Sequence, residues 1–164
     1  MNLLLQRLLD HNLYATRLTL ETCRGLSADQ FHQRFEIGPG SLHDTLRHVV
    51  GAMLRWSDRI MHREVRPSIE QPGARFSVDD LLRLLEQGDR EFRAAAQDAE
   101  ARLDQTMSVQ FAPQMPVMQF TRASALVHVA THGAHHRAQA LNMLRRLGVT
   151  DRPHLDALAA ERGP

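Results

Sequence analysis

Three histidines at four-residue spacing are the feature of this sequence best suited to chemistry. His128, His132 and His136 lie in LVHVATHGAHHRAQALNMLRRL, residues 126–147, a run with no proline and one glycine. On an α-helix such residues stack along one face, with about 5–6 Å between neighbouring Cβ atoms, so two imidazoles can bind one ion. The spacing therefore predicts a metal site on a helix.

A catalytic centre of the zinc type uses three protein ligands, so a helical pair needs a third ligand from elsewhere in the chain. His48 is the best candidate, because its neighbours one turn away, Thr45, Gly51 and Ala52, are small and leave room for a ligand. Asp44 either accepts a hydrogen bond from His48 or, more commonly, is an exposed acid in an approximate capping box. Without a third ligand, the helical histidines are equally consistent with a solvent-facing row.

Four stretches with helical periodicity supply the elements that would position these residues. Apolar side chains recur at spacings of three and four in each stretch, which is typical of amphipathic helices. Ser41, Ser77 and Thr121 are N-cap residues, and Gly25 and Gly148 are C-terminal stops. The expected helices comprise residues 2–24, 42–62, 78–103 and 122–147.

The connections between these helices are long and rich in proline and glycine. Residues 26–40 form the first, with a short helical turn expected at Ala28–His32. The second, residues 64–76, has a length that suits a crossover or a lid over a site. Residues 105–120 break the chain again without a convincing strand pattern, and Pro153 is a candidate start for a last short helix reaching Ala160. We expect one domain, residues 1–164, forming an all-α four-helix bundle with a short C-terminal tail.

Composition excludes some classes of function. A net charge of +1, with acidic and basic residues interleaved, is not the footprint of a nucleic-acid-binding protein. The single cysteine, Cys23, cannot form an internal disulfide and is expected to be a packing residue in a reducing compartment. Arg7 and Asp10 interrupt the N-terminal leucines, so this segment favours a helix over a signal peptide, and no run suits a membrane span. We expect a cytoplasmic protein with no nucleic-acid or membrane partner.

The histidine run resembles the last-helix signature of the DinB/YfiT-like superfamily. There, histidines at four-residue steps lead into Arg-Gly-Gln; here Arg137, Ala138 and Gln139 follow, with alanine in place of the glycine. The segment GSLHDTLRHVVGAMLRW resembles the second helix of that family, whose histidine corresponds to His48. The similarity also includes Asn12 after the first leucines, and Gly148 and Asp151 after the last helix.

This resemblance implies one divalent metal ion, most often zinc or nickel, held by His48, His132 and His136 in a homodimer. Family members include thiol S-transferases that use bacillithiol or mycothiol, maleylpyruvate isomerases, and proteins without a known activity. We therefore expect a metal-dependent enzyme that activates a low-molecular-weight thiol for transfer to an electrophilic small-molecule substrate. The alternatives are a hydrolase or isomerase at the same metal, and a non-catalytic metal-binding dimer with a role in stress responses.

Four further residues beside the triad are candidates for supporting roles. His128 and His135 are not family ligands and are expected to flank or support the site. Arg137 is a candidate for holding an anionic substrate, although a surface or dimer contact is the commoner role for such an arginine. Gln139 lies within a turn of His136 and either orients its ring or faces solvent in a polar patch.

Overall fold

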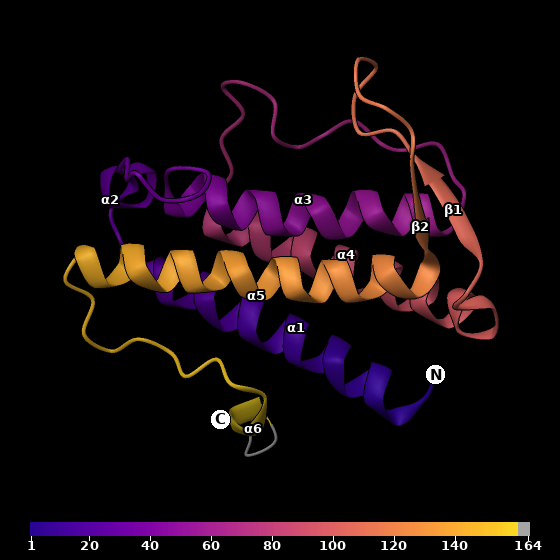
Figure 1. Cartoon of the computed structure of the whole chain (residues 1–164). Helices are drawn as coiled ribbons and strands as arrows, with labels where there is room; N and C mark the ends of the chain where they lie inside the picture. Colours follow the sequence, from indigo (N-terminus) through magenta and orange to yellow (C-terminus); the bar gives the residue numbers. More distant parts are fainter. Residues whose placement is uncertain (161–164) are drawn as a thin grey trace.

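Four long amphipathic helices pack around an apolar core in the computed structural model, which describes residues 1–160 (Figure 1). The predicted all-α architecture is confirmed, and each long helix begins and ends close to its expected position. The helices are α1 (Leu3–Thr22), α3 (Leu42–Ile60), α4 (Val78–Ala99) and α5 (Arg122–Arg146). None of the helices in this described part of the chain combines the length and the apolar character needed to cross a membrane.

Side-chain caps explain where the helices begin. Ser77 forms a full capping box with Asp80, in which each side chain accepts from the other residue's backbone N–H. Ser41 accepts a hydrogen bond from the Asp44 backbone N–H at 3.0 Å. The second half of the box expected at Ser41 is not formed, because the Asp44 carboxylate instead accepts from Arg34 at 2.7 Å.

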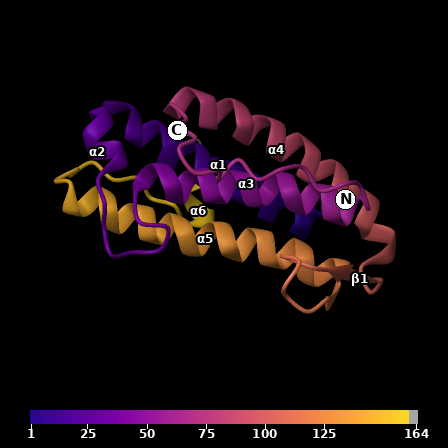
Figure 2. The ribbon, with the colours of Figure 1, turned by 90° about the horizontal axis from the view of Figure 1, so that it is seen from above.

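The chain order of the bundle includes a crossover. The connection after α3 returns along the length of that helix before α4 begins, so α3 and α4 run parallel, and α1 and α5 run opposite to them (Figures 1 and 2). This connection packs closely on α3 at Gly51, where a Cβ atom would lie 3.1 Å from Cγ1 of Ile69. This packing brings the connection next to the part of α3 that carries His48.

Three of the shorter helical elements adjoin the ends of the long helices, and the fourth, α6 (Ala157–Ala160), packs along α1. The predicted turn of helix is confirmed as α2 (Ala28–His32), and single 3-10 turns, Cys23–Gly25 and Glu100–Arg102, follow α1 and α4. The last helix, α6 (Ala157–Ala160), is shorter than expected, because it begins four residues after Pro153. The rest of the C-terminal segment after α5 is irregular up to that point.

A small β-hairpin lies between α4 and α5, where no strand was predicted. Strands β1 (Thr106–Val109) and β2 (Met118–Thr121) pair antiparallel, with Thr106 opposite Thr121. Alternating burial occurs only in β1, over four residues, and β2 has no alternation, so periodicity could not identify the pair. The hairpin loop carries Phe111 to the Trp56 ring on α3, at 6.0 Å between ring centroids.

The core is formed by the inward stripes of the four long helices, as the hydrophobic periodicity predicted. Its fully buried side chains include Leu9 and Leu20 of α1, Leu46, Val50 and Leu54 of α3, Leu81, Leu85 and Phe92 of α4, and Met143 and Leu144 of α5. Cys23 is also buried, and burial raises the pKa of its thiol to about 12. This matches the expected role of Cys23 as a packing residue.

An ion pair fastens the start of the crossover connection to α3. The Asp58 side chain is buried and accepts hydrogen bonds from the Arg66 backbone N–H, Nε and Nη2, at 3.1, 2.7 and 2.6 Å. Burial alone would raise the pKa of Asp58, but the hydrogen bonds from Arg66 outweigh it and lower the pKa below 3.8. The ionised carboxylate is therefore the form that the fold stabilises.

We predict an acid-sensitive contribution of Asp58 to stability. Because its folded-state pKa is depressed, this contribution is complete above the unfolded pKa and is lost as the pH falls through the folded value. Charge-assisted hydrogen bonds of this kind are worth about 2 kcal/mol. Denaturant unfolding between neutral pH and pH about 3 should show a larger loss for the wild type than for Asp58→Asn. Asp104→Asn, at an exposed position, is the control and should follow the wild type; identical pH profiles for all three proteins would contradict the prediction.

Candidate metal centre

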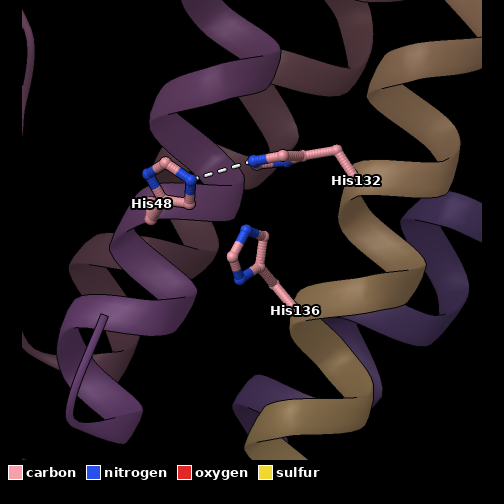
Figure 3. A group of neighbouring side chains, drawn as sticks. All are labelled: His48, His132 and His136. Atoms are coloured by element: carbon pink, nitrogen blue, oxygen red, sulfur yellow. Dashed lines mark hydrogen bonds between the residues drawn. The ribbon is translucent and has the colours of Figure 1, made fainter. Parts of the chain in front are cut away.

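Three histidines from two helices meet on one side of the bundle (Figure 3). His48 comes from α3, and His132 and His136 come from successive turns of α5. One ring nitrogen from each lies within 4.8 Å of the others, an arrangement that could hold a divalent metal ion. The closest pair is Nε2 of His48 and Nε2 of His132, at 2.9 Å. All three side chains are half-buried, so the group remains accessible from one side.

Two neighbouring side chains orient the outer nitrogens of this triad. Glu70 Oε2 lies 2.8 Å from Nδ1 of His48, and the hydrogen bond from His48 lowers the pKa of Glu70. The Glu70 carboxylate is therefore ionised and accepts, so Nδ1 of His48 carries the proton and Nε2 keeps its lone pair. Gln139 acts in the same way, because its Oε1 accepts from Nδ1 of His136 at 2.8 Å.

The α2–α3 loop approaches Gln139 closely. Gly38 in this loop has φ +49°, and a Cβ atom there would lie 2.1 Å from Oε1 of Gln139. Only glycine leaves room for the amide to reach His136 in this backbone conformation. The α2–α3 loop, although far from α5 in the sequence, thus leaves the space from which Gln139 contacts His136.

The donor set fits a divalent ion of the zinc or nickel type. Such ions take neutral imidazole nitrogens at about 2.0–2.1 Å, and two such ligands at a tetrahedral angle lie about 3.4 Å apart. One pair of nitrogens in the triad is 2.9 Å apart and all three lie within 4.8 Å of one another, so small side-chain rotations would place the three nitrogens around one ion. The carboxylate and the amide behind the rings are the hydrogen-bond acceptors that metal-binding histidines commonly use.

Electrostatics keep two of the rings neutral. Burial, followed by the nearby rings of His48 and His136, lowers the pKa of His132 to about 3. Burial also lowers the pKa of His136, and the hydrogen bond with Gln139 offsets this only in part. Both rings are therefore uncharged at neutral pH, and an uncharged imidazole is the form that binds a metal.

The acceptor for His48 is Glu70, and sequence reasoning had considered Asp44 instead. Asp44 lies on another side of α3, where its carboxylate pairs with Arg34, Arg47 and His43 at 2.7, 3.1 and 3.0 Å. Glu70 is 22 residues from His48 and lies in the proline-rich crossover connection, so no helical spacing links the two residues. Its only signal in the sequence is an acid within a connection long enough to cover a site.

Arg137 does not face the triad. Its side chain is only 2% exposed and points to α1, where Nη1 donates to Asn12 Oδ1 at 2.8 Å and to Thr16 Oγ1 at 3.0 Å. Burial lowers the pKa of Arg137 to about 10. Both expectations for this arginine, substrate binding and a surface contact, are therefore wrong. Its role is to join α5 to α1 directly behind the histidine face.

The two other histidines of the run have different positions. His135 is exposed, and its Nε2 accepts from Nε2 of Gln139 at 2.9 Å. His128 packs against Trp56, with ring centroids 5.1 Å apart, and lies one turn beyond His132. His135 thus helps to orient Gln139, whereas His128 lines the space beside the triad.

An open cleft of about 280 Å³ adjoins the triad. Its wall on α3 includes His48 and Trp56, its wall on α5 includes His128 and His132, and Phe111 comes from the hairpin loop. A second cavity of about 270 Å³ shares Trp56, Phe111 and His128 with the first and is almost entirely apolar. The two together are large enough for a small organic molecule.

Comparison with known proteins identifies a family for the whole chain. The sequence matches the family model described as "DinB family" over residues 1–163. Comparison with curated proteins finds no match.

Proposed function

This chain belongs to the DinB family, and from this premise we propose that it is a metal-dependent enzyme that activates a low-molecular-weight thiol. The thiol sulfur is then transferred to an electrophilic small molecule. The observation that carries the proposal is the position of the triad, because His48 and His132 form part of the wall of an open cleft. A site that only stapled the helices together would have no need of such an opening.

Different residues of the chain have different roles in this proposed function. His48, His132 and His136 would hold one divalent ion, for which zinc and nickel suit the three imidazole donors. When bound, such an ion acts as a Lewis acid that lowers the pKa of a coordinated thiol toward neutrality. Glu70 and Gln139 hold two of the rings in the tautomer that presents Nε2 to the centre of the triad. The cleft walls exclude bulk water from one side of the bound thiol.

In the proposed reaction the thiol sulfur is the nucleophile and attacks an electrophilic carbon, by displacement or by addition. In the displacement, a carbon–sulfur bond forms, and the bond to the leaving group breaks with its electron pair. The thiol proton is released to solvent, so the products are a thioether and the acid of the leaving group. No protein cysteine takes part, in agreement with the burial of Cys23 and its raised pKa.

Two further parts of the proposal concern setting and assembly. We place the reaction in the cytoplasm, where low-molecular-weight thiols are kept reduced. We also propose a homodimer. An apolar surface pocket between α1 and α5 supports it, because its lining includes Leu4 and Val127, which are 82% and 54% exposed.

The test combines metal content with thiol transfer. Purified protein, loaded with zinc or nickel or stripped by a chelator, is assayed with monochlorobimane and bacillithiol, mycothiol, glutathione or cysteine. We expect a rate above the uncatalysed reaction with at least one thiol, only in the loaded protein. Equal rates for loaded and stripped protein with every thiol would reject the proposed activity.

A substitution behind the ring of His48 sharpens this test. Glu70→Gln keeps the shape of the side chain but removes the carboxylate charge that accepts from Nδ1 of His48 and orients its ring, so metal affinity should fall about 10–100-fold. Glu64→Gln makes the same change at an exposed position of the same connection and should leave the affinity unchanged. Competition with a chromogenic chelator measures both affinities, and equal values for the two variants would show that Glu70 does not support the site.

A further inference from the structure

Two arginines share one stripe of α3 with His48. Arg55 and Arg59 lie seven and eleven residues beyond His48, a spacing that places all three on the same side of the helix. Both guanidinium-bearing side chains line the cleft that adjoins the triad. The cleft therefore has the triad residues His48 and His132 at one end and a pair of positive charges at the other.

Neither arginine has a carboxylate partner within residues 1–160. Nε of Arg55 is buried and has no hydrogen-bond partner there. The guanidinium of Arg59 stacks on rings instead, 5.4 Å from the Trp56 centroid and 5.6 Å from the Phe111 centroid. The acid whose charge acts on Arg59 is Asp58, and both carboxylate oxygens of Asp58 accept hydrogen bonds from Arg66.

The energetics of this arrangement are unfavourable without a ligand. Burial and the like charge of Arg55 both lower the pKa of Arg59, which shows that its charge is poorly compensated. Two positive side chains in one partly buried cleft repel each other, and an unpaired buried Nε–H has an additional desolvation cost. An anion between the two guanidinium groups would remove both penalties.

One acid, Glu70, lines the cleft, but its partner is His48 and not either arginine. Glu70 is held by His48, so its negative charge belongs to the triad end. In the metal-free protein an anion would be repelled there and attracted at Arg55 and Arg59. The charges of the metal-free cleft thus favour the arginine end as the position of the anionic group.

We propose that this cleft binds an organic anion, with a carboxylate or phosphate group between Arg55 and Arg59 and an apolar body against Trp56 and Phe111. A planar guanidinium pairs with either group through two parallel hydrogen bonds. The apolar cavity that shares Trp56 and Phe111 extends the space for the body of the molecule. Binding itself requires no metal, whereas the identification of this anion as the electrophilic substrate rests on the function proposed above.

The helix also sets the length of such a substrate. Arg55 lies two turns from His48, which is a rise of about 10 Å along α3. The reactive carbon would therefore be separated from the anionic group by roughly this distance, with the aromatic side chains between them. Anions with the electrophilic carbon next to the charged group would be poor substrates.

The experiment uses the sole tryptophan of the chain. Trp56 lines the cleft, so its fluorescence reports binding directly. Metal-stripped protein is titrated with benzoate, phenyl phosphate and the neutral amide benzamide, and we expect the two anions to bind and benzamide to bind at least about tenfold more weakly. The relative affinities of benzoate and phenyl phosphate identify which anionic group the arginines prefer.

Variants assign the effect to the two arginines. Arg55→Gln and Arg59→Gln should each weaken anion binding about tenfold or more, with benzamide binding changed by less than about twofold. Arg90→Gln removes the same charge from an exposed position on α4 and should behave as the wild type. Arg55→Lys, which retains the charge, should recover part of the affinity.

Equal binding of benzoate and benzamide, or equal losses in Arg55→Gln and Arg90→Gln, would overturn the proposal. Because the titration is made without metal, this failure is distinct from failure of the thiol-transfer activity. A protein that binds benzoate but never transfers thiols would keep the anion site and lose the proposed enzyme. Circular dichroism of each variant confirms that the helices are intact.

Discussion

Replacing His132 by alanine will abolish stoichiometric metal binding while leaving the helical content unchanged. Nε2 of His132 lies 2.9 Å from Nε2 of His48, and His132 is one helical turn from His136. Two remaining imidazoles on different helices form a much weaker site, because a third ligand and its preorganisation are lost together. The side chain is only half-buried and its ring contacts are with other histidines, so alanine should be well tolerated in the middle of α5.

Elemental analysis of tag-free protein after dialysis measures this effect. We expect about one divalent ion per chain in the wild type and in His135→Ala, whose histidine is exposed and outside the triad. A full equivalent of metal in His132→Ala would show that the ion, if any, is held elsewhere. No metal in the wild type after incubation with zinc and nickel would show that the triad is not a metal site.

Gly133→Ala will destabilise the fold by about 3 kcal/mol, as overpacking and lost buried hydrogen bonds combine. A Cβ atom at this position would lie 2.6 Å from Oδ1 of Asn12 and 2.7 Å from Nη1 of Arg137. These two atoms are bonded to each other at 2.8 Å, and both side chains are buried, so neither can move aside without breaking the contact. Chemical denaturation gives the free energy of unfolding.

The matched control is Gly88→Ala in the middle of α4. There a Cβ atom would meet the nearest side chains at 3.6 Å, an ordinary van der Waals distance. Alanine should therefore be neutral or stabilising by up to about 1 kcal/mol, which is its advantage over glycine in a helix. If Gly133→Ala were as stable as Gly88→Ala, the contact between α1 and Arg137 would not be a rigid one.

The long helices were predictable because local signals agree with the packing. Hydrophobic periodicity marks each inward stripe, and serine or threonine caps mark the starts, so the pattern gave the bundle and most of its boundaries. The hairpin was not predictable in this way. Its four-residue strands owe their structure to each other, and only Met107 and Val109 are buried in alternation.

The residues of the candidate site likewise fall into those that local sequence signals predict and those that they do not. His132 and His136 share a helix, so their spacing alone brings them together, and the resemblance of the α3 segment added His48. Glu70 lies in a loop whose path is set by the crossover, and no local rule connects it to His48. Arg137 was misplaced because a helix has two flanks beside its histidine face, and only tertiary packing decides which one contacts α1.

The walls of the cleft differ in local stability, and this difference determines where a ligand can enter. The wall with the histidines belongs to α3 and α5, whose unfolding requires loss of the bundle core, whereas Phe111 is carried by a hairpin of two four-residue strands. Short two-stranded hairpins are marginal by themselves, and local openings draw on such low-stability regions. The hairpin side of the cleft, which carries Phe111, therefore opens at a lower free-energy cost than the side formed by α3 and α5. Ligands therefore enter past the hairpin, while the three imidazoles keep their geometry.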